Sequence, residues 1–243
     1  MASIEISEEG GVRYLHFGSD WVQGAMRIAR PWSLELEYTR EMMLPLVLRP
    51  QAGWPAGVLQ VGLGSASQTR FLHRYRPRSR ITVVEIDPAV VSAARQFFKL
   101  PGESPRLRIE IADGHEFMAA KPRRFDFILV DGFDERGRTG MLDTLPFYLN
   151  CRERLSAKGL IAVNLVDRNR GVGASVARLR EAFDDRVLVL PRCEEANTVA
   201  VAAVGRPIEE SQEALRASAR ALRTQTGLDL LPLIERLGWK GSL

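Results

Sequence analysis

Glycines and acids that could do chemistry follow four apolar segments of strand length. Gly62 and Gly64 follow "GVLQV", and Glu85 lies in "VVEID". Asp113 follows "RIEIA", and Asp131 follows "FDFILV". In a parallel sheet, ligands bind at the carboxyl ends of the strands, where these residues would lie together. Their order on successive strands therefore predicts one shared site.

The residue types indicate a nucleoside as the ligand of this site. Gly62 and Gly64 let the backbone approach a ligand closely and open onto a predicted helix N-terminus. Glu85, 21 residues beyond Gly64, can accept hydrogen bonds from two ribose hydroxyls. Asp113 is an acceptor suited to an exocyclic amine. Ser67 replaces the third glycine of a dinucleotide-binding motif, so we expect an adenosine-containing ligand without a pyrophosphate.

The fourth segment ends in two acids, Asp131 and Asp134, set three positions apart. A carboxylate with a pKa near 4 is a poor base for an ammonium with a pKa near 10. We expect partial desolvation, together with the like charge of Asp134, to raise the pKa of Asp131. The alternative is that Asp131 caps the following loop and that Asp134 is only solvated.

Strand-length and helix-length segments alternate after residue 57, which indicates repeated βαβ units. Strands are predicted at 57–62, 80–87, 106–112, 125–131, 159–166, 185–191 and 197–204. Helices are predicted near 65–75, 88–99, 114–120, 142–156 and 172–183. Asp87 and Pro88 form a helix start, and Lys158 with Gly159 is expected to end a helix. The last two strands are too close in sequence for a helix between them, so we predict an antiparallel hairpin.

The remaining segments complete an α/β fold with a seven-stranded, mostly parallel sheet. Residues 1–50 are predicted to form a small β-hairpin cap, with a turn at 18–20, and a connecting helix at about 33–48. Residues 51–243 are predicted to form the nucleoside-binding catalytic domain. Two amphipathic helices are expected within 208–226 and 228–238.

Composition narrows the functional class. The chain has 243 residues with a net charge of +4, and it contains no apolar run of membrane-spanning length. We expect a cytoplasmic protein. Its two cysteines and three histidines are scattered, so we predict no metal site. The arginine-rich segment 70–80 could contact nucleic acid, but we favour a solvated helix face because the segment lacks the interleaved exposed aromatic residues expected of a single-strand binder.

From Gln23 to about Leu165 the chain resembles the spermidine synthase (polyamine aminopropyltransferase) family. The matching motifs are "VEID", "DGHEFM" and "FDFILVDGFD", followed by Phe147 and Tyr148. The resemblance implies transfer of an aminopropyl group from decarboxylated S-adenosylmethionine to a diamine such as putrescine, in polyamine biosynthesis. It also implies a Rossmann-like class I methyltransferase fold and a homodimer.

The resemblance also implies roles for individual residues. Asp131 would be the catalytic proton acceptor, and Asp134 and Tyr38 would bind the diamine. The donor nucleoside would be bound by an extended set: Gln23, Gly62, Gly64, Ser65, Glu85, Ile86, Asp113 and Gly114.

Two departures from the family pattern leave alternatives open. Ser65 stands where the family has an aspartate that binds the donor's amino group, and Arg136 and Arg138 follow the acid pair. The first alternative is a methyltransferase that uses S-adenosylmethionine and an unknown acceptor. The second is an inactive nucleoside-binding or dimerisation module.

Overall fold

The main sheet of the computed structural model carries the site. The structure describes all residues except 1–2, 19–20, 121–122, 135–136, 167–170 and 194–195. Within the described part, seven strands lie in the order β6-β5-β4-β7-β8-β10-β9. Their bounds are Gly57–Val61 (β4), Arg80–Glu85 (β5), Leu107–Ile111 (β6), Phe125–Val130 (β7), Leu155–Val166 (β8), Val187–Val189 (β9) and Asn197–Ala203 (β10). The predicted fold class is confirmed.

Strand directions match the sequence pattern. The pairs β4–β5, β5–β6, β4–β7 and β7–β8 are parallel. Strand β10 is antiparallel to both β8 and β9, which confirms the predicted terminal hairpin. The order along the chain reverses at β4, whose neighbours are β5 and β7. Such a reversal opens a crevice at the carboxyl ends of the central strands.

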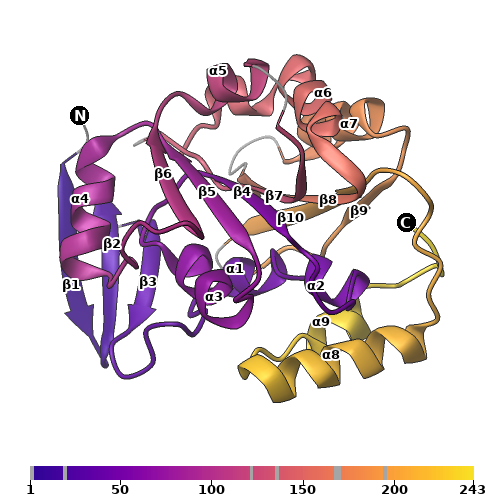
Figure 1. The fold of residues 1–243 in the computed structure, drawn as a ribbon, viewed down its shortest axis with the longest axis horizontal. Coiled ribbons are helices and arrows are strands. Elements are labelled where there is room, and N and C mark those ends of the chain that lie inside the picture. The colour runs from indigo at the N-terminus through magenta and orange to yellow at the C-terminus, as the bar shows by residue number, and fades with distance from the viewer. Residues whose placement is uncertain (1–2, 19–20, 121–122, 135–136, 167–170, 194–195) are drawn as a thin grey trace.

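Helices cover both faces of this sheet (Figure 1). The helices of the βαβ units are Ser67–Tyr75 (α3), Pro88–Phe97 (α4), Gly114–Ala119 (α5), Leu145–Glu153 (α6) and Gly173–Ala182 (α7). Apolar residues of α3 and α4 join the core on one face, and those of α5, α6 and α7 join the core on the other. Both faces of the central strands are therefore buried, as their apolar sequences require.

The N-terminal cap has three strands where the sequence predicts two. Strands Ile4–Glu9 (β1), Val12–Phe17 (β2) and Gly24–Arg27 (β3) pair antiparallel. The acidic first strand gives little apolar signal, and it turns at Gly10 and Gly11, both with positive φ. Part of the predicted turn at 18–20 lies outside the described residues.

The predicted helix at 33–48 is two short helices, Glu37–Glu41 (α1) and Pro45–Leu48 (α2). Pro45 explains the break, because it has no backbone N–H to donate to a preceding carbonyl and begins α2 instead. Residues of both helices pack into the same core as the main sheet. The domain division at residue 50 stays a prediction.

The predicted helix at 142–156 is also wrong at both ends. A 3₁₀ turn at Gly140–Asp143 precedes α6, and β8 already begins at Leu155. Lys158 and Gly159, predicted to end the helix, therefore lie inside β8. The register between β7 and β8 shifts near Phe125, where Leu155 is its partner. This early pairing gives the segment no regular strand alternation.

The C-terminal helices are as predicted. They span Gln212–Thr226 (α8) and Leu231–Arg236 (α9), and α8 packs against α2. Arg236 forms ion pairs with Glu37 and Glu41 of α1. The C-terminal segment thus supports the helix that carries Tyr38.

Candidate active site

A pocket of about 580 Å³ opens at the carboxyl ends of β4, β5, β7 and β8. It is the predicted site, and residues of the N-terminal cap close one side of it. The predicted residues that line it are Gln23, Tyr38, Gly62, Gly64, Glu85, Ile86, Asp113, Gly114, Asp131 and Asp134. Ser65 is not among the lining residues.

Gly62 is required by a close approach between two strand ends. It adopts φ +89°, and an added Cβ would lie 2.1 Å from the Asp131 backbone oxygen. The Asp131 N–H donates to the Val61 carbonyl over 2.9 Å. The end of β7 is thus held directly beside the glycine loop, so the loop and Asp131 form one rigid unit.

Ser65 faces away from the pocket, into the contact with the N-terminal cap. It is 3% exposed, and its Oγ lies 2.9 Å from the Ser67 Oγ. An added Cβ on Gly24 of β3 would lie 2.4 Å from that Ser65 oxygen. In the structure Ser65 therefore packs the glycine loop against β3.

Glu85 sits at the end of β5 with both carboxylate oxygens engaged. Oε2 accepts a hydrogen bond from the Leu63 N–H at 2.8 Å, and Oε1 accepts one from the Asp87 N–H at 3.0 Å. Burial raises the pKa of Glu85, and these bonds oppose the rise. The carboxylate is fixed on the pocket wall, with lone pairs left to accept ligand hydroxyl groups. The neighbouring Ile86 is 64% exposed at the pocket edge.

Asp113 caps α5 while lining the pocket. Its Oδ1 accepts hydrogen bonds from the backbone N–H groups of His115 at 2.7 Å and Glu116 at 3.1 Å. Oδ2 makes neither bond and is the oxygen suited to a ligand amine. The next residue is a glycine, Gly114, and a larger side chain would not fit there, because an added Cβ would lie 2.5 Å from the Val61 Cγ1.

Asp131 is surrounded by uncharged hydrogen-bond donors. Asn164 donates to Oδ1 at 2.8 Å, and Gln68 donates to Oδ2 at 3.3 Å. Tyr38 of α1 is also hydrogen-bonded to this carboxylate. Burial raises the pKa of Asp131 to about 6, while the three donors act to lower it. The interpretation of Asp131 as a loop cap is not supported, since its bonds come from side chains of other elements.

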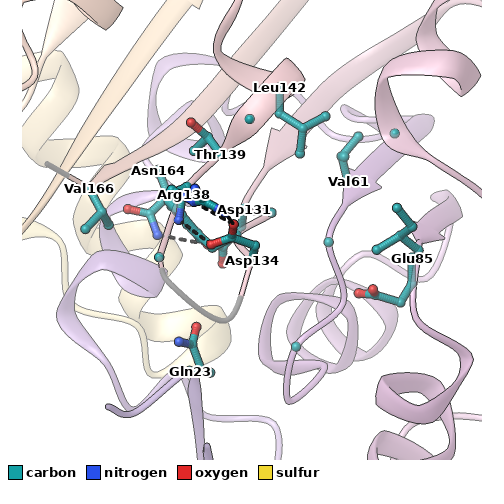
Figure 2. A pocket seen from close by; sticks show the side chains of 18 of the residues that line it. Gln23, Val61, Glu85, Asp131, Asp134, Arg138, Thr139, Leu142, Asn164 and Val166 are labelled. Atoms are coloured by element: carbon teal, nitrogen blue, oxygen red, sulfur yellow. Dashed lines mark hydrogen bonds and ion pairs between the residues drawn. The ribbon is translucent and has the colours of Figure 1, made fainter. Parts of the chain in front are cut away.

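Asp134 has a different environment. Its carboxylate accepts hydrogen bonds from the Arg138 backbone N–H at 2.9 Å and from the Arg138 Nε at 2.8 Å (Figure 2). The side chains of Asp134 and Arg138 are 38% and 65% exposed. Asp134 is not among the causes that shift the Asp131 pKa. The predicted like-charge effect is therefore wrong, and the paired cation of Arg138 is the physical reason.

The sequence did not predict four residues that form hydrogen bonds around the acid pair, either with the two carboxylates or with one another. Arg138 was noted only as a nearby charge, and Arg136 lies outside the described residues. The other three are Gln68, Asn164 and Asn197. The two asparagines interrupt otherwise apolar strand sequences, "GLIAVNLV" and "NTVAVAAV". A polar residue near the end of a buried strand was the available signal.

The predicted Gln23 lies between the cap and the pocket. Its backbone N–H donates to the Leu15 carbonyl at 2.8 Å, which continues the pairing of β2 with β3. Figure 2 shows its side chain on the same side of the pocket as Asp134 and Arg138. Gln23 and Tyr38 together bring the N-terminal segment into the site.

The other surface predictions can be placed as well. Arg70 of the arginine-rich segment is buried and bonds to backbone carbonyls of Pro31, Ser65 and Phe98. Arg74 stacks over Trp32 at 4.1 Å. Arg70 therefore belongs to the buried part of the segment, whereas Arg74 lies over the ring of Trp32. No metal-binding cluster of acids, histidines or cysteines occurs among the described residues. In the same part of the chain, every helix is too short or too polar to span a membrane.

The mostly parallel sheet, the glycine loop after β4 and the acids at or just after the ends of β5, β6 and β7 define a class I methyltransferase-like fold. The Spermine/spermidine synthase domain profile matches residues 37–165. Polyamine aminopropyltransferase of Neisseria meningitidis serogroup A is 37% identical over 226 residues, 93% of this chain and 85% of the relative. The polyamine aminopropyltransferase of Chromobacterium violaceum is 36% identical over 237 residues, which cover 98% of this chain and 90% of the relative. The chain belongs to the spermine/spermidine synthase family.

Solved structures agree with the fold. Human methyltransferase-like protein 13 in complex with SAH has a TM-score of 0.68 and 26% identity, covering 79% of this chain and 92% of that one. Spermidine synthase from Thermotoga maritima has a TM-score of 0.60 and 21% identity, covering 93% and 88%. The predicted family and the predicted transferase class are both confirmed.

Proposed function

We propose that this protein transfers the aminopropyl group of decarboxylated S-adenosylmethionine to one amine of a diamine such as putrescine, with Asp131 as the proton acceptor. The observation that carries the proposal is the environment of Asp131. Its carboxylate lines the pocket, is bonded by uncharged donors, and has a pKa of about 6. The names of the curated relatives support the same reaction.

The donor would lie between the glycine loop and the ends of β5 and β6. Glu85 would accept hydrogen bonds from the ribose, and the Asp113 Oδ2 would accept one from the adenine amine. Beyond the loop, the pocket presents the carboxylates of Asp131 and Asp134. A cationic aminopropyl chain is favoured there over a methionine carboxylate, which the ionised Asp131 would repel.

Ser65 needs a revised role in this proposal. Its buried position against β3 suits packing of the loop and not recognition of the donor's amino group. The carboxylates that line the pocket would supply that recognition. The difference from the family pattern then changes how the donor is held and leaves the proton acceptor in place.

The proposed reaction is a displacement at the propyl carbon attached to sulfur. A bond forms from the acceptor nitrogen to this carbon, and the carbon–sulfur bond breaks with its electron pair passing to sulfur. The products are methylthioadenosine and the extended polyamine, and the proton lost by the nitrogen passes to Asp131. The positive sulfonium lowers the pKa of the nearby ammonium, which reduces the gap to the pKa of Asp131. The protein mainly holds the reactants in line.

Incubation with decarboxylated S-adenosylmethionine and putrescine tests the proposal. We expect release of methylthioadenosine by the wild type and loss of that release in Asp131→Asn. Formation of S-adenosylhomocysteine from S-adenosylmethionine and a cell extract would show methyl transfer instead. Absence of binding to either nucleoside in calorimetry would leave only the inactive-module alternative.

We also propose that the protein acts as a cytoplasmic homodimer, with residues 1–50 as a cap domain. The support is the family resemblance and the separate β1–β2–β3 sheet. Sedimentation equilibrium tests the dimer, and a single monomeric species at micromolar concentration would contradict it.

A further inference from the structure

Two asparagines and Asp131 form a directed chain of hydrogen bonds. The Asn197 Nδ2 donates to the Asn164 Oδ1 at 2.8 Å, and the Asn164 Nδ2 donates to the Asp131 Oδ1 at 2.8 Å. Figure 2 shows the Asn164 amide beside the Asp131 carboxylate. An ionised carboxylate only accepts hydrogen bonds, so the Asn164 nitrogen must face it and the Asn164 oxygen must face Asn197.

The three side chains come from neighbouring strands and share one face of the sheet. Asp131 follows β7, Asn164 is near the carboxyl end of β8, and Asn197 begins β10. Because β10 runs antiparallel to β8, with Asn197 opposite Val166, its first residue lies beside the end of β8. Side chains alternate along a strand, and each of the three falls on the face covered by α3 and α8.

The burial of both amides makes their pairing necessary. Asn164 is 2% exposed and Asn197 is 8% exposed, in strands whose neighbouring residues are apolar. A buried amide without a partner destabilises the folded state, because it loses its hydrogen bonds to water without replacing them. Each amide in this chain has a partner, and the last acceptor is the carboxylate proposed to take the proton.

We propose that Asn197 is a positioning residue, which fixes the Asn164 amide so that its nitrogen and not its oxygen faces Asp131. The proposal rests on the proposed function of Asp131 as proton acceptor. Without Asn197, the Asn164 amide can rotate, and its oxygen can then accept a hydrogen bond from the protonated Asp131. The protonated form of Asp131 would be favoured, and a smaller fraction of the protein would have the ionised carboxylate that can accept a proton.

The other groups that face Asp131 do not orient the Asn164 amide. Tyr38 from α1 and Gln68 from α3 bond to the carboxylate, and both are uncharged near neutral pH. On the loop after β7, the charge of Asp134 is paired with Arg138. Of the hydrogen bonds that oppose the rise of the Asp131 pKa, the one from Asn164 has the largest effect. Orientation of its amide is therefore the property to test.

The test compares Asn197→Ala with Thr198→Val. Thr198 is buried on the same strand but points to the opposite face, so its variant controls for loss of a buried polar group on β10. In Asn197→Ala we expect the acid limb of the kcat/KM profile to move up by about one pH unit, the effect of one lost hydrogen bond. KM for the donor should stay unchanged, and Thr198→Val should leave the limb in place.

A second variant and a second readout keep the test decisive. Asn197→Leu fills a similar space without a donor or a charge, so it should release the amide and move the limb about as far. If Asn197→Ala does not fold, this variant gives the answer alone. If both variants raised KM and left the acid limb of the kcat/KM profile in place, the proposal would be overturned and Asn197 would instead contact the substrate. An unmoved limb with unchanged constants would also overturn it.

NMR titration of the Asp131 carboxyl carbon separates this inference from the proposed function. The signal is assigned by its absence in Asp131→Asn, and its midpoint does not depend on turnover. A wild type without activity on decarboxylated S-adenosylmethionine would defeat the proposed function, yet a raised midpoint in Asn197→Ala would still support the amide chain. An unchanged midpoint would overturn the chain whatever the activity.

Discussion

Asp131 and Asp134 lie three positions apart after the same strand, yet their surroundings differ. Asp131 contacts amide and hydroxyl donors of α1, α3 and β8, and its pKa is raised to about 6. Asp134 is partly exposed and bonded twice by Arg138 from its own loop. The difference teaches that the carboxylate held by distant elements binds its proton more tightly than usual, whereas the exposed carboxylate is paired with a cation of its own loop.

The cause lies in what each residue can reach. Asp131 is still held by the sheet, since its N–H bonds to Val61 of β4. Its side chain therefore points into the space lined by neighbouring strands. Asp134 is past the sheet, where backbone bonds within the loop bring Arg138 close. The environment of Asp131 is thus set by elements distant in sequence, whereas the environment of Asp134 is set by its own loop.

The largest expected effect is on turnover in Asp131→Asn. A positioned base contributes about 10²–10⁴-fold to the rate, and we expect a loss of that size in kcat, measured as methylthioadenosine release. Asp134→Asn is the matched control and should act mainly on KM for the diamine. Equal losses of kcat in the two variants would remove the distinction between the acids.

Gly62→Ala should have the next largest effect, because it separates the glycine loop from Asp131. The new Cβ would meet the Asp131 carbonyl at 2.1 Å, in a backbone with φ +89°. We expect the free energy of unfolding to fall by about 2–4 kcal/mol, measured by urea denaturation. Gly10→Ala also has positive φ but nothing within 4 Å, so it should lose only about 1 kcal/mol. Equal losses would show that backbone strain alone matters.

Stability against pH distinguishes the two acids more finely. Burial raises the pKa of Asp131 from its ordinary value of 3.8 to about 6 in the folded protein, so the folded state holds the proton more tightly. Ionisation then costs stability, and this cost develops as the pH rises from about 4 to 6 and is complete above that. Asp131→Asn should raise the unfolding free energy at pH 8 by about 1–2 kcal/mol and lose this gain near pH 4. The partly solvated site limits the size of the gain.

Thermal melts of Asp134→Asn provide the comparison for that result. Exposed ion pairs contribute about 0–1 kcal/mol, so its stability should change little and without the same dependence on pH. A gain at pH 8 in Asp134→Asn, or none in Asp131→Asn, would contradict the different environments described for the two acids.

The smallest effect is expected from Arg138→Gln. Removing this cation frees Asp134 to bind an ammonium, so KM for putrescine should fall a few-fold, with kcat nearly unchanged, corresponding to about 1 kcal/mol. The effect should weaken at high salt. Arg216→Gln breaks a comparable exposed pair with Glu235 and should leave KM unchanged. A rise of KM in Arg138→Gln would show that the arginine assists the acceptor.

The same contrast separates what the sequence could predict from what it could not. The strand segments, the terminal hairpin and the acids at the strand ends followed from apolar periodicity and spacing. The partners of Asp131 did not, because Tyr38, Gln68 and Asn164 come from separate elements that only the fold brings together. Ser65 was placed in the site by alignment, but its side-chain direction is set by β3. Helix ends near Pro45 and Leu155 depended on local breaks that periodicity does not register.

The pH dependence of methylthioadenosine release from decarboxylated S-adenosylmethionine and putrescine tests the central claim most directly. The account predicts an acid limb near pH 6 in the wild type, a similar limb in Asp134→Asn, and no such limb in the residual activity of Asp131→Asn. A wild-type rate that stays constant down to pH 5, or an Asp131→Asn variant that keeps both the limb and the rate, would contradict it.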